Sequence, residues 1–199
     1  MAKKVIITIG REFGSEGHEI GRQLAENLGV SMYDRDLLTL AAKKSGIAVE
    51  TLAGADEKVA NRFLEAYLPT GIDQGTLNDR LFRIQSSVIL DIAAKESCVI
   101  IGRCADYILR DTPNCINVFI YAPFEDRVKI ISEKHVMEIE EARKLVKKMD
   151  NVRNSYYTYY SDRNWNTKEG KDILLNRSTL GIDGCVDILE VMARKAMEG

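Results

Sequence analysis

The chain has 199 residues, of which 45% are hydrophobic and 29% charged, and its formal net charge is −2 at pH 7. This length suits one domain with a sizeable core, and the near-neutral charge argues against a partner that is a nucleic acid polymer or an anionic membrane. The four cysteines form no C-x-x-C pair and there are only two histidines, which argues against a zinc site and predicts reduced thiols. We therefore expect a cytoplasmic globular protein.

The first apolar segment, KVIITI (4–9), is rich in β-branched residues and ends at Gly10, as expected of a buried parallel strand. It is too short for a signal peptide or a membrane span. Apolar residues then recur at helical spacing from His18 until Gly29, which is placed to end a helix.

The rest of the chain continues this alternation of strands and helices. Such alternation predicts one α/β domain in which a five-stranded parallel sheet carries helices on both faces. Further strands are predicted at 30–33, 98–102, 115–122 and 172–176. Further helices are predicted at about 35–46 (capped by Asp34), 55–68, 77–95, 123–134, 138–160 and from near Ile182 to the end.

The segment GREFGSEG (10–17) joins the first strand to its helix. Open parallel sheets bind ligands at the carboxyl ends of their strands, where this segment is expected. Gly10, Gly14 and Gly17 permit positive φ and close approach of the backbone. Their N–H groups, together with the positive end of the helix dipole, predict a nest for phosphate.

This segment departs from the standard phosphate-binding loop, G-x-x-x-x-G-K-[S/T], because Gly17 is followed by His18 and Glu19. The lysine that reaches the terminal phosphates is therefore missing. Arg11 or His18 could replace part of its charge, and the hydroxyl of Ser15 could serve Mg²⁺.

Three acidic residues, Glu12, Glu16 and Glu19, bring negative charge close to the expected phosphates. A plain strand–turn–helix corner, whose glycines serve only packing, is the alternative, and the loop by itself leaves both interpretations open.

Two longer stretches carry a family resemblance. The stretch CVIIGRCADYILRDTPNCINVFIYAPFEDRVKII (98–131) resembles the central part of bacterial cytidylate kinases, and DILLNRSTLGIDGCVDIL (172–189) resembles their last strand and helix. The loop segment GSEGHEIGRQLAENLGVSMYDRDLL (14–38) and the aromatic run at 156–165 resemble the cytidylate kinase-like family more closely still. The resemblance covers nearly the whole chain.

This resemblance implies a P-loop fold of the nucleoside monophosphate kinase type, with a helical acceptor-binding insert at 47–95 and a lid at 138–165. It also implies transfer of the γ-phosphoryl group of ATP, as the Mg²⁺ complex, to a nucleoside monophosphate or similar small acceptor. CMP or dCMP is the acceptor that the family name suggests. Phosphoryl transfer needs positioning and positive charge rather than a covalent catalyst.

The same resemblance implies site residues. Arg103 matches the arginine that holds the acceptor monophosphate, and a planar guanidinium suits that contact. Asp34 and Arg35 fall where the acceptor site begins, and Asp150 and Arg153 match the Asp-x-x-Arg of the lid. Lys147 and Arg163 are weaker additions. The predicted catalytic residues are Arg11, Arg103, Asp150 and Arg153, and the predicted ATP-binding residues are Gly10, Arg11, Gly14, Ser15, Glu16, Gly17 and His18.

Other substitutions argue against activity. Ile101 stands where cytidylate kinases have an acid before Gly-Arg, and Cys104 replaces the aspartate after it. A nucleotide- or anion-binding module that has lost catalysis, with a role in sensing or assembly, is therefore the alternative function.

Each site residue also has a structural interpretation. Arg103 could pair with Asp106 or Asp111, Asp150 and Arg153 could form a solvated pair on one helix, and Asp34 could be a helix cap alone.

The tyrosine cluster YYTYY (156–160) could stack on bases, but no basic patch accompanies it, which favours packing of the lid. The predicted insert carries an apolar face that could close over an acceptor or bind a second subunit of a homo-oligomer. The residues of this face are Leu81, Phe82, Ile84, Val88 and Ile92.

Overall fold

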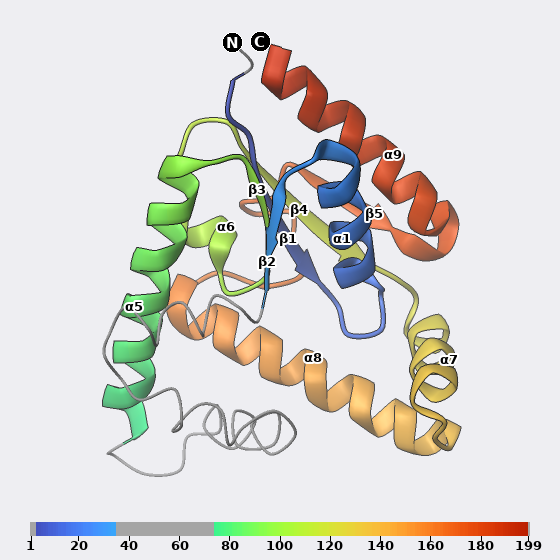
Figure 1. Ribbon diagram of the computed structural model, residues 1–199. Helices are drawn as coiled ribbons and strands as arrows, with labels where there is room; N and C mark the ends of the chain where they lie inside the picture. Colours follow the sequence, from blue (N-terminus) through green and yellow to red (C-terminus); the bar gives the residue numbers. More distant parts are fainter. Residues whose placement is uncertain (1–2, 35–73, 199) are drawn as a thin grey trace. The chain divides into compact units, whose positions relative to one another are not determined.

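A computed structural model describes residues 3–34 and 74–198 (Figure 1). The chain divides into two compact units, one formed by Met1–Met32 with Glu96–Gly199 and the other by Tyr33–Lys95. In the second unit the described helix is α5 (Gln74–Lys95), as predicted at 77–95. The helices predicted at 35–46 and 55–68, and most of the predicted insert, lie outside the described residues.

The first unit is built on a sheet with the strand order β2-β3-β1-β4-β5. The neighbours of β1 pair with it in parallel, with Ile6 opposite both Cys98 and Cys115. This confirms the predicted five-stranded parallel sheet. Because β1 is central, its carboxyl end adjoins the ends of both β3 and β4. The strands are β1 (Ile6–Arg11), β2 (Ser31–Tyr33), β3 (Cys98–Ile101), β4 (Cys115–Tyr121) and β5 (Ile173–Asn176).

One face of the sheet is covered by α1 (Gly17–Leu28) and α9 (Arg177–Glu198), which lie side by side on it (Figure 1). Fully buried aliphatic side chains of β1, β3, α1 and α9 form the core there, Leu24 and Leu189 among them. Helix α1 approaches the sheet closely, since a β-carbon at Gly21 would lie 2.5 Å from Ile101 Cδ1. This packing fixes the position of the loop that enters α1.

The opposite face is covered within the first unit by α6 (Ala105–Ile108) and by Trp165, whose ring meets Phe119 edge-on at 5.3 Å. Two further helices, α7 (Phe124–His135) and α8 (Ile139–Ser161), pack against each other around a small apolar cluster. The cluster consists of Val128, Ile131, Ala142 and Val146.

One predicted element differs from the structure: the helix-sized segment between the third and fourth strands contains a helix of only four residues. Helix α9 starts with a short helical turn at Arg177 and is broken at Gly181, where φ is 71° and ψ is 179°, so its long regular part begins at Ile182, near the predicted start. The conformation at Gly181 is almost confined to glycine. None of the helices within residues 3–34 and 74–198 is long and apolar enough to cross a membrane.

The break in α9 gives a stability prediction. Gly181→Ala should lower the free energy of unfolding by about 1–3 kcal/mol, because alanine is strained at this φ and ψ. Gly184→Ala, three residues further along the same helix, is the matched control. Its new β-carbon would make an ordinary contact, 3.5 Å from Leu180 Cβ, and should stabilise the helix by up to about 1 kcal/mol. Urea unfolding of both variants measures the difference, and shifts of the same sign would contradict it.

Candidate functional site

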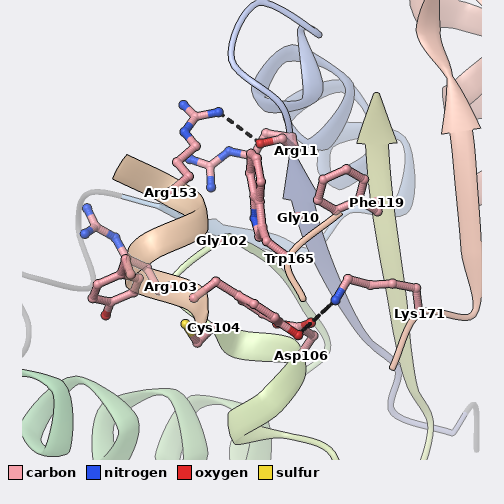
Figure 2. A pocket seen from close by; sticks show the side chains of 12 residues that line it. Gly10, Arg11, Gly102, Arg103, Cys104, Asp106, Phe119, Arg153, Trp165 and Lys171 are labelled. Atoms are coloured by element: carbon pink, nitrogen blue, oxygen red, sulfur yellow. Dashed lines mark hydrogen bonds and ion pairs between the residues drawn. The ribbon is translucent and has the colours of Figure 1, made fainter. Parts of the chain in front are cut away.

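A small pocket opens where β1 and β3 end, and all the residues that line it belong to the first unit (Figure 2). Its charged lining comprises Arg11, Arg103, Arg153 and Lys171, with Asp106 as the only acidic side chain among its lining residues. The cavity measures about 60 Å³, several times the 10–15 Å³ or so that one water molecule requires. The pocket therefore suits a small anionic group.

Arg11 connects this pocket to the start of α1. A β-carbon at Gly17 would lie 2.6 Å from Arg11 Cβ, and one at Gly102 would overlap Arg11 Nη1. The backbone of Arg11 is held as well, because Arg153 Nη1 donates a hydrogen bond to the Arg11 carbonyl at 3.0 Å (Figure 2). The side chain thus runs from the first residue of α1 to the residue that follows β3.

The turn that carries Arg103 is strained. Gly102, Arg103 and Cys104 have φ values of 69°, 61° and 54°, so three consecutive residues lie in the left-handed region. Only glycine adopts this region without a steric penalty, and non-glycine residues there concentrate at functional sites. This turn lies directly after the buried strand β3 and places Arg103 on the pocket wall, and the surrounding structure must maintain the strain.

A buried polar cluster forms another part of the pocket wall. Lys171 Nζ lies 2.5 Å from Asp106 Oδ2 and 3.0 Å from the hydroxyl of Tyr157, which itself donates to Asp106 Oδ2 at 2.8 Å. Burial and the neighbouring Asp106 carboxylate raise the pKa of Tyr157, so its hydroxyl stays protonated. Burial likewise raises the pKa of the Cys104 thiol, which excludes this cysteine as a ready nucleophile.

The loop that follows β1 is held by side chains of α7 and α8. Asp150 Oδ1 accepts a hydrogen bond from the Phe13 N–H at 2.8 Å, and Arg127 Nη1 donates to the Phe13 carbonyl at 3.0 Å. The Arg127 guanidinium, which is only 6% exposed, also bridges two carboxylates, Glu12 at 3.1 Å and Asp150 at 2.5 Å. The shape of the loop thus depends on two helices that follow it in the chain by more than 100 residues.

Comparison with known proteins identifies the family. The model of the cytidylate kinase-like family matches residues 6–179. The chain belongs to this family. None of the curated proteins compared with the chain matches it significantly.

Solved structures agree with this family at the level of the fold. An uncharacterised protein from Eubacterium ventriosum is 28% identical, with a TM-score of 0.74, and the match covers 96% of this chain and 98% of that one. Shikimate kinase from Acinetobacter baumannii, in complex with shikimate, is 14% identical with a TM-score of 0.54 over 98% and 96% of the two chains. Shikimate kinase from Bacteroides thetaiotaomicron is also 14% identical, with a TM-score of 0.55 over 94% and 97%. The two shikimate kinases show a shared P-loop kinase fold.

The predicted site residues of this family member fall into separate groups. The pocket brings together Gly10, Arg11, Arg103 and Arg153. Asp150 does not line it and instead fixes the loop backbone. Asp34 belongs to the second unit, and Arg35 lies outside the described residues.

The other predicted loop residues form the turn into α1 and do not line the pocket. Glu16 adopts a left-handed conformation (φ 57°), and its carboxylate forms an ion pair with Arg177, at the start of α9. Ser15 is fully buried, with its hydroxyl 2.9 Å and 3.2 Å from the carbonyl oxygens of Glu12 and Ile120. This placement counts against the predicted metal role of Ser15. His18 is exposed on the first turn of α1, and Gly14, at φ 84°, packs on the Arg127 backbone.

The two weaker candidates also lie outside the pocket lining. Lys147 lies over the Phe124 ring at 5.6 Å, and Arg163 forms an ion pair with Glu169 at 3.7 Å. Ile101, where an acid was expected, is completely buried in the core.

Sequence reasoning missed Lys171, Asp106 as a pocket residue, Trp165, and the Arg127 bridge. Arg127 is the arginine of the Glu-Asp-Arg segment, so a family motif marks it, whereas no motif marks Asp106, which lies two residues after Cys104. Nothing in the sequence marks Lys171, which reaches the pocket because β5 begins beside it.

Arg103 provides a direct test of backbone strain. Arg103→Gly and Arg103→Ala both remove the guanidinium, but only glycine relieves the left-handed conformation. The glycine variant should therefore be more stable than the alanine variant by about 1–2 kcal/mol. Urea unfolding measures this difference, and equal stabilities would show that the turn is not strained.

Arg127→Met should lower the free energy of unfolding by about 3–5 kcal/mol at pH 7, because Glu12 and Asp150 lose their shared countercharge. Burial already raises the pKa of Glu12, and the guanidinium opposes that rise. Removal of the guanidinium should raise the folded pKa of Glu12 further, so the deficit should grow as pH rises past the wild-type folded pKa of Glu12 toward that of the variant.

Arg143→Met is the matched control, since Arg143 also lies 5.6 Å from the Phe124 ring but pairs with an exposed carboxylate, Glu125. It should cost less than about 1 kcal/mol. Urea unfolding between pH 4.5 and 7 distinguishes the two, and a deficit in Arg127→Met that does not change with pH would contradict the prediction.

Proposed function

We propose that the protein is a phosphotransferase that moves the γ-phosphoryl group of MgATP to a small acceptor in the cytoplasm. Membership of the cytidylate kinase-like family supports a nucleotide kinase-like function. By the family name, the acceptor is a nucleoside monophosphate, with CMP or dCMP as the first choice. We take the phosphate loop to hold the donor and the pocket beside it to hold the acceptor.

The presence of three arginines on the wall of one pocket beside the phosphate loop carries this proposal. Arg11 comes from β1, Arg103 follows β3, and Arg153 comes from α8, yet all three line one pocket. Phosphoryl transfer requires positive charge around the moving group, and guanidinium groups supply it without a change of protonation. We take Arg11 to replace the missing lysine, and two contacts support this: its stem passes Gly17 and its guanidinium reaches Gly102.

On the donor side, the turn into α1 supports binding of the ATP phosphates. The first N–H groups of α1 have no acceptor within the helix, and the helix dipole places partial positive charge there. Among the described residues, no group of three or more His, Cys, Asp or Glu side chains is placed to hold a metal ion. Mg²⁺ would therefore arrive on the nucleotide phosphates, as part of the substrate.

The alternative is a nucleotide- or anion-binding module without catalysis, acting in sensing or assembly. Two observations favour it: Ile101 is buried in the core where cytidylate kinases carry an acid, and the Ser15 hydroxyl is turned toward backbone carbonyls. These features remove groups that would organise Mg²⁺. Binding of ATP with no turnover would support this alternative.

A panel of nucleoside monophosphates with ATP and Mg²⁺, read by coupled ADP formation, tests the proposal. We expect ADP formation that requires an acceptor and is abolished by EDTA. Arg11→Ala should reduce the rate by about 100-fold or more, because it removes charge from the transition state. Gly102→Ala should act in the same direction, since its β-carbon would displace the Arg11 guanidinium.

Arg194→Ala is the matched control, because this arginine pairs with Glu190 on the exposed surface of α9. It should leave the rate unchanged. Full activity of Arg11→Ala would contradict charge replacement by Arg11, and thermal stabilisation by ATP without ADP formation would favour the binding module.

A further inference from the structure

We propose that Asp106 is a specificity residue of the pocket, which accepts a hydrogen bond from a hydroxyl or amino group of the acceptor. The arginines would hold the oxyanion of the same molecule. The pocket would then select small phosphomonoesters that carry a hydrogen-bond donor over those that lack one. This inference rests on the proposed function, because it takes the pocket as the acceptor site.

The Asp106 carboxylate has one oxygen engaged and one available. Oδ2 accepts hydrogen bonds from Tyr157 at 2.8 Å and from Lys171 at 2.5 Å. No hydrogen bond to Oδ1 comes from any residue in the described part of the chain, although the side chain is 11% exposed on the pocket wall. A carboxylate oxygen is a strong acceptor, so a ligand hydroxyl or amine fits this atom.

Lys171 acts through Asp106 rather than as a further anion-binding residue. Its side chain is 1% exposed, and its ammonium contacts both the Asp106 carboxylate and the Tyr157 hydroxyl. Tyr157 and Lys171 come from α8 and from the segment before β5, so two separate parts of the chain orient one carboxylate. Such double support fixes an acceptor atom in place before a ligand binds.

The anion-binding groups lie apart from this carboxylate within the pocket. In Figure 2 the contact between Arg153 and Arg11 and the pair formed by Asp106 and Lys171 lie at opposite ends of the labelled lining, with Trp165 between them. A ligand that reaches both ends must carry an anion and a donor group a short distance apart. The cavity of about 60 Å³ limits it to a small molecule or to one end of a larger one.

Trp165 makes this inference measurable, because it is the single tryptophan of the chain and lines the pocket. The probes are glycerol 1-phosphate and n-propyl phosphate, which carry the same anion and differ only in hydroxyl groups. Titration of the full-length protein, followed by tryptophan fluorescence and repeated by calorimetry, gives the ratio of the two dissociation constants. We expect glycerol 1-phosphate to bind about tenfold more tightly, as for a hydrogen bond to a charged group.

Asp106→Asn should bring this ratio close to one and leave binding of n-propyl phosphate in place. Asp111→Asn is the matched control, because that carboxylate is 88% exposed and pairs with Arg110 outside the pocket; it should keep the ratio. Should Asp106→Asn fail to fold, the double variant Asp106→Asn with Lys171→Met replaces it, since it leaves no unpaired buried ammonium. A purely structural role of Asp106 would weaken both probes equally and keep the ratio.

Equal affinity of the wild-type protein for the two probes would overturn the inference, as would an unchanged ratio in Asp106→Asn or no binding of either probe. The coupled ADP assay separates this result from the proposed function. If ADP forms but the two dissociation constants are equal, only the proposed role of Asp106 is refuted. If the dissociation constants differ about tenfold but no ADP forms, only the proposed phosphoryl transfer is refuted.

Discussion

The site depends on one side chain, that of Arg11, lying across two glycines. Gly17 and Gly102 each lack the β-carbon that would collide with it, so the arginine can extend from the start of α1 to the end of β3. Parallel pairing of β1 with β3 brings those two points together. This arrangement supports our proposal that the Arg11 guanidinium serves in place of the lysine of a standard phosphate loop.

The surrounding charges explain how that loop keeps its shape. Glu12, an acid that the sequence places near the expected phosphates, is turned away from them: its carboxylate accepts a hydrogen bond from the Ala122 N–H at 3.1 Å and pairs with Arg127. Asp150 likewise binds the backbone of Phe13. Buried carboxylates of this kind are costly without partners, so the loop, α7 and α8 are linked through Arg127. The carboxylates of Glu12 and Asp150, which could repel a nucleotide, are thus used to fix the backbone of the loop.

The fold was predictable because its strands are short, β-branched and separated by helical patterns, and tertiary contacts reinforce that local signal. Arg103 and Arg153, which were identified by their match to family motifs, both line the pocket that Gly10 and Arg11 also line. Contacts between distant side chains were not predictable. Whether Asp150 meets a substrate or a backbone N–H depends on how α8 packs. Lys171 meets Asp106 only because the segment before β5 packs beside α6.

The distribution of strain separates a rebuilt site from a degenerate one. A loop that had lost its function would be free to relax, yet Arg103 and Cys104 keep a left-handed backbone directly after β3. Glu16 also has a left-handed backbone conformation, directly before α1, where glycine would fit without a steric penalty. Each of these residues has a defined position. Arg103 lines the pocket, Cys104 is the residue before α6, and Glu16 forms an ion pair with Arg177. Of these strained residues, Arg103 and Cys104 line the pocket, as is common where a ligand binds, and this supports our proposal of a phosphate site reorganised around arginine.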